Sequence, residues 1–540
     1  MEKRLCPQCQ QTFIVSDGDL SYYQRLQVPV PTKCPQCRFQ LRMSFRNERF
    51  LYRRECALCH QSTLAQYSSD KPYPIYCRTC WWSDRWDPLS FGQEIDWTQP
   101  FFPQFSAVKA RTPHIALLND ADSENSDFCN RVNKLKSCYM IYDAVGNEQC
   151  AYGSGLYGNK DSIDCDYCDR VELCYDTIYS SDCYGLRSAR NCAHCRDSAY
   201  LVDCVGVSNS LMCVGLRNVQ YHYKNKTLTQ AEFDRVWKTQ QPTQAEFEQF
   251  ALKIPRRYYN GINNEASSGD FLTNTYHTEQ SFQVRASEHC KYCYGVHHTK
   301  DSYDYTIWGD QAELMYEDHA CGGQCYKIWF GNVVWYGHDT LYCDSCLNGA
   351  QYCFGCVGLK NEQYCILNRQ YAPEEFSAIQ ERLIKHMRAT KEWGNFFPAD
   401  LSDFAYNETM AHEFFPLTKQ QALVGGWGWQ DQLPGTFGQA DPAKNIFTCL
   451  QCQKNYKLIA QELDFYKQQG ITLPINCPDC RHQNRMRYRS PYKLWPRQCM
   501  CQQANHNHGG QICTEQFETA YAPDRPELIY CSECFQKEVY

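Results

Sequence analysis

The middle of the chain, from about residue 129, alternates short apolar runs with Gly, Asn, Ser and Asp. Cysteines recur at every ninth position in Cys174, Cys183 and Cys192, and Cys195 opens a second triplet with the same spacing. Several Asp, Tyr and Gly positions agree at the offset between the two triplets. A short fixed period is typical of a stacked solenoid, and runs this short favour strands over helices. We therefore predict a mainly β fold around a central β-solenoid with a period of about 21 residues.

A longer repeat divides this solenoid into two sections. The segment 213–221 returns at 356–364, a shift of 143 positions. Each copy precedes a helical pattern, and Thr229-Gln-Ala-Glu232 and Thr243-Gln-Ala-Glu246 are capping boxes that start two such helices. We expect each section to end in a strand, a turn and a helix that covers the open edge of the solenoid.

The two ends of the chain carry copies of one cysteine-rich module, at a constant offset of 443 positions. C-x2-C pairs dominate both copies, and two such pairs complete one tetrahedral metal site. The predicted zinc ligands are Cys6, Cys9, Cys34 and Cys37; Cys56, Cys59, Cys77 and Cys80; Cys449, Cys452, Cys477 and Cys480; and Cys499, Cys501, Cys531 and Cys534. About four zinc ions are expected, and closed four-thiolate shells make them structural.

Two alternatives to this assignment stay open. Disulfides are the first, although repeated C-x2-C motifs favour metal. Interleaved pairing of the cysteine pairs, as in RING-like folds, is the second. The last set also departs from the pattern, because one residue separates Cys499 from Cys501, and Cys513, His506 and His508 in the following insertion are candidate replacement ligands.

The predicted organisation has seven segments. They are a double zinc-ribbon module (1–88), a connector (89–127), the first solenoid section (128–225), a helical cap (226–259), the second solenoid section (260–371), a helix with an aromatic-rich connector (372–443) and the second double zinc-ribbon module (444–540).

Composition favours an intracellular, reduced protein. The chain of 540 residues has 37 cysteines and a net charge of −7, so there is no global reason to bind polyanions. No apolar run reaches membrane-spanning length, and the start, Met1-Glu-Lys-Arg-Leu, has no signal-peptide pattern. We expect reduced cysteines, a cytoplasmic location and no membrane partner.

Arginines after the second cysteine pair of each module suggest a function. Residues 38–54 hold six arginines and one acid, and residues 481–497 hold five arginines and no acid. The trios Arg38, Arg42, Arg46 and Arg481, Arg485, Arg489 are spaced by four, so a helix would place each on one face. With interleaved aromatics such faces suit phosphate contact and base stacking. The alternative is that these arginines pair with acids elsewhere in the fold.

The solenoid offers two weaker candidate sites. Cysteine pairs such as Cys343/Cys346 with Cys353/Cys356 are candidate metal ligands, although a buried packing role is favoured. The second section also gathers histidines and carboxylates suited to metal binding or proton transfer. These are His289, His297, His298, His319, His338, Asp301, Asp304, Asp310, Glu317, Asp318 and Asp339.

Several motifs together indicate a family. They include Cys34-Pro-Gln-Cys-Arg38, Tyr76-Cys-Arg-Thr-Cys-Trp-Trp82 and Cys356-Val-Gly-Leu-Lys-Asn361. Over nearly its whole length the chain resembles large zinc-ribbon and Cys/Tyr-repeat proteins of candidate-phyla bacteria. This resemblance implies no particular activity.

The leading functional hypothesis is a non-enzymatic zinc-binding scaffold that docks RNA or a ribonucleoprotein through the two arginine faces. The second is a protein-interaction scaffold that uses the tyrosine-rich solenoid surface. The third is a metalloenzyme with its site in the second solenoid section.

Overall fold

The computed structural model describes residues 1–120, 122–307, 309, 316, 321–322, 334–335, 338–506, 508–509 and 511–539. The chain forms two compact units, each assembled from separate stretches of sequence. Unit 1 comprises Met1–Ala116, Tyr259–Leu433 and Pro491–Leu494, and unit 2 comprises Leu117–Tyr258, Pro434–Ser490 and Trp495–Tyr540. Unit 1 therefore joins the first zinc module to the second solenoid section, and unit 2 joins most of the second zinc module to the first solenoid section.

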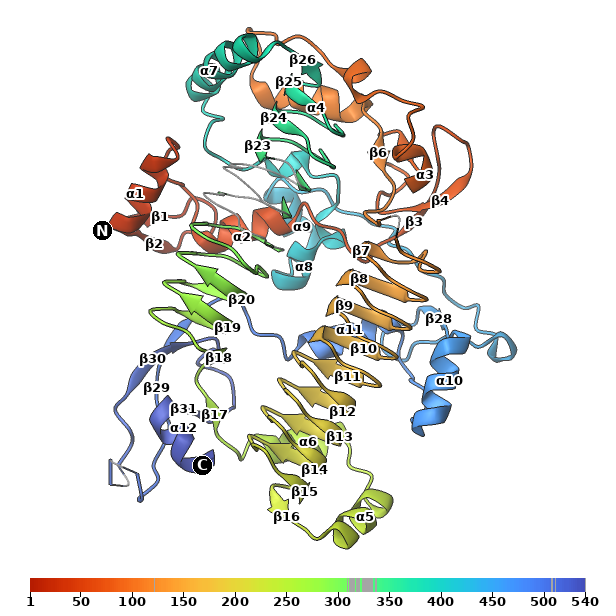
Figure 1. Cartoon of the computed structure of the whole chain (residues 1–540), viewed down its shortest axis with the longest axis vertical. Helices are drawn as coiled ribbons and strands as arrows, with labels where there is room; N and C mark the ends of the chain where they lie inside the picture. Colours follow the sequence, from red (N-terminus) through yellow and green to blue (C-terminus); the bar gives the residue numbers. More distant parts are fainter. Residues whose placement is uncertain are drawn as a thin grey trace. The chain divides into compact units, whose positions relative to one another are not determined.

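The solenoid of unit 2 is a ladder of parallel strands (Figure 1). Its strands are β7(Asn130–Asn133), β8(Tyr139–Val145), β9(Ala151–Tyr157), β10(Ile163–Asp169), β11(Tyr175–Ile178), β12(Tyr184–Arg190), β13(Arg196–Val202), β14(Ser208–Val214) and β15(Gln220–Tyr223). Neighbouring strands pair at a constant offset of twelve positions, as Ile163 with Tyr175 and Cys165 with Thr177. The solenoid is confirmed, but one rung spans twelve positions, so the predicted period of 21 is wrong as a rung length.

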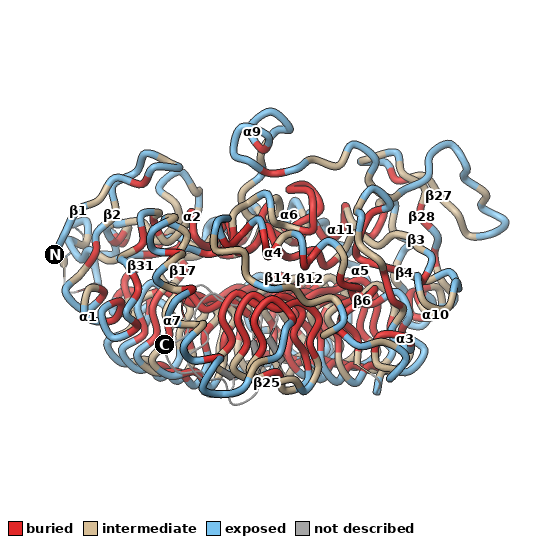
Figure 2. The backbone as a smooth tube through the Cα atoms, turned by 90° about the horizontal axis from the view of Figure 1, so that it is seen from above, coloured by how far each residue is buried: buried red, intermediate tan, exposed pale blue. Residues whose placement is uncertain are grey.

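A three-residue unit explains both numbers. Tyr167 and Arg170 have left-handed φ angles of 52° and 51°, and the residue after each, Cys168 and Val171, lies in the interior. This alternation recurs along the whole ladder, so four corners complete one turn. The cysteine spacings of nine and 21 are multiples of three. They therefore show which positions lie in the interior, but they do not show how many residues make one rung. Figure 2 shows the stacked rungs with their buried residues in red.

Cysteine suits these interior positions because it is small and can donate a weak hydrogen bond. The Cys168 thiol donates to the carbonyl of Asp166 at 3.3 Å and to that of Thr177, one rung on, at 3.6 Å. Ser162 fills an equivalent position and donates to the Lys160 carbonyl at 2.8 Å. These contacts agree with a packing role for the solenoid cysteines.

Unit 1 contains the second solenoid section, with partner offsets between eleven and thirteen positions. Its strands are β18(Gly261–Ile262), β19(Gly269–Tyr276), β20(Ser281–Glu288), β21(Cys321–Gly322), β22(Val334–Trp335), β23(His338–Leu341), β24(Gln351–Phe354) and β25(Gln363–Ile366). Isolated bridges continue the ladder beyond β20, for example from Phe282 to Tyr294 to Thr306.

Each solenoid section ends in a cap of the same design, as the longer repeat predicts. The last strand turns into a short antiparallel strand, β16(Lys226–Thr227) or β26(Arg369–Gln370), and helices follow. The helices are α5(Gln230–Thr239), α6(Gln244–Ala251) and α7(Pro373–Ala389), and both predicted capping boxes are formed. Asn225 and Asn368 fix the turns, since each exchanges two hydrogen bonds with the backbone of the preceding rung, at Val214 and Val357 respectively.

The two zinc modules also share one layout. The first contains β1(Glu2–Leu5), β2(Thr12–Val15), α1(Asp17–Arg25), α2(Pro35–Met43), β3(Tyr52–Glu55), β4(Ser62–Ala65), β5(Ile75–Tyr76) and α3(Arg78–Trp81). The second contains β27(Ile446–Thr448), β28(Asn455–Lys457), α10(Ala460–Gln469), α11(Pro478–Met486), β29(Trp495–Gln498), β30(Gln516–Thr519), β31(Ile529–Tyr530) and α12(Ser532–Val539). The remaining elements are η1(Pro88–Phe91), α4(Phe101–Arg111), β6(His114–Ile115), β17(Arg256–Arg257), η2(Ala399–Leu401), η3(Tyr406–Glu408), α8(Met410–Phe414), α9(Lys419–Val424) and η4(Pro442–Lys444).

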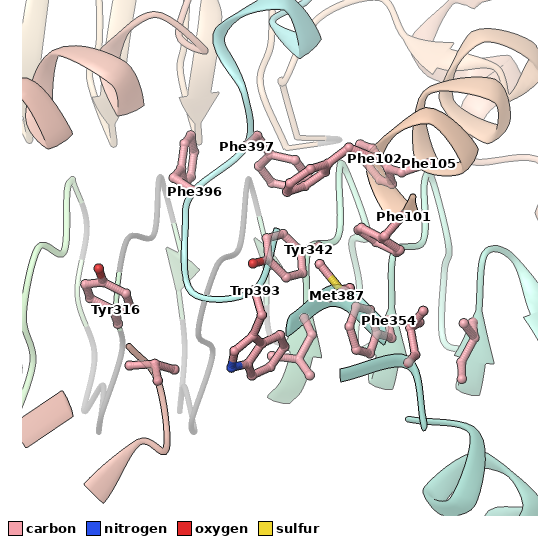
Figure 3. Packing of buried hydrophobic residues seen from close by; sticks show 14 of the residues in the cluster. Phe101, Phe102, Phe105, Tyr316, Tyr342, Phe354, Met387, Trp393, Phe396 and Phe397 are labelled. Carbon is pink, nitrogen blue, oxygen red and sulfur yellow. The ribbon is translucent and has the colours of Figure 1, made fainter. Parts of the chain in front are cut away.

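An aromatic core joins α4 to the solenoid of unit 1. Figure 3 shows Phe101 and Phe102 beside Tyr342 and Phe354, and Phe397 packs against Phe102 and Tyr342. The backbone N–H groups of Phe101 and Phe102 donate to the carboxylate of Glu392, both at 2.8 Å. This distant carboxylate satisfies the free N–H groups at the start of α4, where Pro100 offers no side-chain cap.

Candidate metal centres

Three of the predicted four-cysteine sets are gathered as the sequence indicates. Their ligand atoms lie within 4.8 Å of one another, which suits a tetrahedral four-thiolate zinc shell with sulfurs about 3.8 Å apart. The sets are Cys6, Cys9, Cys34, Cys37; Cys56, Cys59, Cys77, Cys80; and Cys449, Cys452, Cys477, Cys480. Consecutive cysteine pairs meet in each of these sets, so the interleaved alternative is not the arrangement found.

Each of these sets is built from one β-turn and one helix start. Cys6 follows β1 at the turn into β2, and Cys34 and Cys37 lie at the N-terminus of α2. The backbone N–H of Cys34 points at the Cys6 sulfur at 3.4 Å, and the Cys9 and Cys34 sulfurs are 3.6 Å apart. Helix N-termini and turn amides stabilise thiolates, which is the form that binds metal.

In each of these three sets one cysteine has a lowered pKa and two have raised pKa values. A hydrogen bond from the Cys37 thiol lowers the pKa of Cys34 to about 5. Burial raises the pKa of Cys56 and Cys449, but backbone donors, first those of Cys77 and Cys477, outweigh it and lower both pKa values to about 6. An ordinary cysteine has a pKa near 8.5, so these three favour the thiolate at neutral pH.

The fourth set differs from the predicted one in a single member. The structure gathers Cys499, Cys531 and Cys534 with Cys513, in place of Cys501. The hairpin of β29 and β30 explains the exchange, because Cys499 follows β29 while Cys513 precedes β30, on the opposite arm. The second ligand therefore comes from the opposite arm of the hairpin and not from a C-x2-C turn.

Cys501 belongs to a fifth group. It lies within ligand distance of His506, His508 and Cys534. The histidines noted in the insertion are thus brought to the metal region, which the sequence suggested but did not assign. The groups found among the described residues therefore include four with four cysteines and one with two cysteines and two histidines, all consistent with structural zinc ions.

The arginine trios do not form the exposed helix faces that the sequence predicted. Arg38, Arg42 and Arg46 are 2%, 0% and 1% exposed, Arg481 and Arg485 are 8% and 3% exposed, and Arg489 is half-buried. Helices α2 and α11 do form there, but they end at Met43 and Met486, before the third arginine of each trio. A phosphate-binding face made by the five buried arginines is therefore wrong.

In unit 1 these arginines hold the zinc module against the solenoid. Arg38 pairs with Asp304 at 2.7 Å, and Arg42 contacts the other carboxylate oxygen at 3.2 Å and Thr306 at 3.0 Å. The Arg38 guanidinium also lies 5.4 Å from the centre of the Tyr292 ring. Arg46 pairs with Glu48 inside the module.

Unit 2 repeats this contact at equivalent positions. Arg481 pairs with Asp164 at 2.8 Å and Arg485 pairs with Asp166 at 2.6 Å, while Arg481 lies over the Tyr152 ring. Tyr152, Asp164 and Asp166 precede Tyr292, Asp304 and Thr306 by the same offset of 140 positions. The duplicated structural unit is thus a zinc module docked on a solenoid section.

The predicted histidine and carboxylate site of the second solenoid section is not assembled within the described residues. Asp304 is buried in the ion pairs with Arg38 and Arg42, and His289 stacks on His277 at 5.5 Å on the surface. An open surface depression of about 720 Å³ in unit 1 is lined by residues of the α1 region and Arg388, and by none of the predicted site residues. Asp310, Glu317, Asp318 and His319 lie outside the described residues.

No family model matches the chain, and no curated protein is similar to it. Among the helices of the described residues, none combines the length and apolarity needed to cross a membrane.

Proposed function

We propose that the chain is a non-catalytic, zinc-stabilised scaffold that binds a protein partner along the outer surface of its solenoid. The zinc modules support this role because their closed ligand sets and buried arginines brace the solenoid. The partner-binding part of the proposal rests on one surface feature, a column of side chains in unit 2.

The column consists of residues at one equivalent position of successive rungs. It runs through Glu124, Lys136, Glu148, Lys160, Glu172, Tyr184 and Arg196. Charges alternate along its first five members, and Lys136 pairs with Glu148 at 3.2 Å. Neighbouring rungs are about 4.8 Å apart, so the column is a rigid, regularly spaced row of binding groups.

This composition favours a protein over a nucleic acid. The three carboxylates of the column would repel the phosphates of an RNA strand while its three cations would attract them. The column therefore offers no net attraction to a polyanion. A protein with matching charges and an apolar contact for Tyr184, which is 38% exposed, fits it better. Unit 1 has a related column in which Tyr276, 40% exposed, precedes the pair of Glu288 and Lys300.

The chain also uses solenoid tyrosines to hold its own helices. Phe247 of α6 packs on Tyr200, Phe233 of α5 packs on Tyr221, and Phe376 of α7 packs on Tyr364. Aromatic contact with an outward tyrosine is thus the way in which this solenoid accepts a helix, and Tyr184 extends the same chemistry to an external partner.

Site-specific photocrosslinking tests the proposal. A photoreactive phenylalanine at position 184 of the full chain should give crosslinked adducts in extracts of the producing cells. Protease should remove these adducts and nuclease should not. The same group at His194, which is exposed on the same solenoid, is the matched control. Nuclease-sensitive adducts would support RNA or a ribonucleoprotein, the partner predicted from the arginines, and equal crosslinking at both positions would refute the column.

A further inference from the structure

The two metal groups at the C-terminal end share one residue. Cys499, Cys513, Cys531 and Cys534 form one group, and Cys501, His506, His508 and Cys534 form the other. Seven different side chains therefore serve two groups of four. Two tetrahedral ions that share one ligand need seven ligands, so the count is complete without water or a partner.

The shared residue lies at the junction of the elements that carry the others. Cys534 is in the first turn of α12, next to Cys531, whose N–H points at the Cys499 sulfur at 3.2 Å. On its other side the Cys534 sulfur is 3.7 Å from Nε2 of His508. The Cys534 thiolate thus faces ligands of both groups at once.

The second group has the burial and support of a built site. Cys501 is fully buried, and its sulfur is 3.0 Å from Nδ1 of His506, a ring that is also buried. The opposite ring nitrogen, Nε2, faces the Glu538 carboxylate at 3.4 Å. A carboxylate behind a metal-binding histidine fixes the orientation of the ring and raises its basicity, and it is common at zinc sites.

We infer that this end of the chain holds a dinuclear zinc centre in which the Cys534 thiolate bridges two ions. One ion is bound by four cysteines, and the other, the mixed ion, is bound by two cysteines and two histidines. Because a zinc–sulfur bond is about 2.3 Å, the two ions would lie about 3.8 Å apart across a tetrahedral sulfur. The three other four-cysteine groups named above would each hold one ion, so these five groups of the described residues would together bind five ions.

The first module offers a matched control. Cys80 holds the same place as Cys534, as the second cysteine at the start of a helix after a short strand, but its group contains no histidine. Cys534→Ser should therefore remove two zinc ions from the full chain, whereas Cys80→Ser should remove one. His506→Gln with His508→Gln should remove one ion and leave four.

Cadmium substitution of the unaltered full chain tests the bridge without any variant. These five groups should give five resonances in the ¹¹³Cd spectrum, and two of them should be split by mutual coupling through the shared sulfur. In the double histidine variant the resonance of the mixed ion should disappear, and its four-thiolate neighbour should lose the splitting. Four bound ions, five ions without coupling, or equal losses from Cys534→Ser and Cys80→Ser would each overturn the inference.

Discussion

Replacement of Arg485 by Gln tests the docking of a zinc module on its solenoid section. Arg485 is 3% exposed and contacts Asp166 at 2.6 Å and Asp164 at 3.1 Å, two carboxylates that are themselves buried. Removal of one member of a buried ion pair leaves an uncompensated charge and costs about 3–5 kcal/mol. Asp164 keeps Arg481 and Asp166 keeps the nearby His482 ring, 3.1 Å away, so we expect a cost near the lower end of that range.

Hydrogen–deuterium exchange of the full chain measures this cost locally. At about 1.4 kcal/mol per factor of ten, the amides of α11 and of β9 to β11 should exchange at least about 100-fold faster in the variant. Arg487→Gln is the control, because Arg487 is exposed at the end of the same helix, and it should change exchange by less than about threefold. Asp166→Asn added to Arg485→Gln should recover part of the loss, because the double variant buries one negative charge fewer. Equal exchange in the Arg485 and Arg487 variants, with zinc content unchanged, would refute the docking role.

Other variants probe the metal sets, the caps and a buried histidine. By elemental analysis, Cys34→Ser and Cys477→Ser should each remove one zinc ion. Each should also expose only its own unit to proteolysis, because metal binding contributes on the order of 10 kcal/mol to local folding. Loss of more than one ion from either variant would contradict separate sites. In denaturant unfolding, Asn368→Ala should cost about 2–3 kcal/mol of stability and Asn225→Ala about 1 kcal/mol. The difference is expected because Asn368 is fully buried and also donates to the Pro88 carbonyl. Equal costs would count against the cap geometry. Burial lowers the pKa of His114, so the unfolded chain takes up a proton at this histidine at a higher pH than the folded chain. Unit 1 should therefore lose stability as the pH falls below about 6.5, the ordinary pKa of histidine. His114→Gln should reduce the dependence of the melting temperature on pH, and an unchanged dependence would exclude the contribution.

The sequence alone was sufficient for the elements whose signal is local. The C-x2-C turns, the capping boxes at Thr229 and Thr243 and the longer solenoid repeat all predict structures that are present. Each of these depends on residues that lie close together in the chain or that are copied within it. Short-range geometry therefore determined the solenoid class, the caps and three of the metal sets.

The rung length needed the structure for a simple reason. Interior positions recur at every third residue, and many spacings are multiples of three, so the cysteine pattern is equally compatible with several rung lengths. Pairing of Ile163 with Tyr175 selects twelve, because four three-residue sides close one turn.

The largest changes concern contacts between distant parts of the chain. The arginines of each module are spaced as a basic helix face, but Arg38 and Arg481 find their partners, Asp304 and Asp164, 266 and 317 residues away in the sequence. Likewise, the exchange of Cys501 for Cys513 depends on the hairpin of β29 and β30. Local patterns show which chemistry a side chain offers, whereas only tertiary packing decides whether a charge is neutralised inside the fold or presented to a partner, because burial makes pairing far more favourable than an isolated charge.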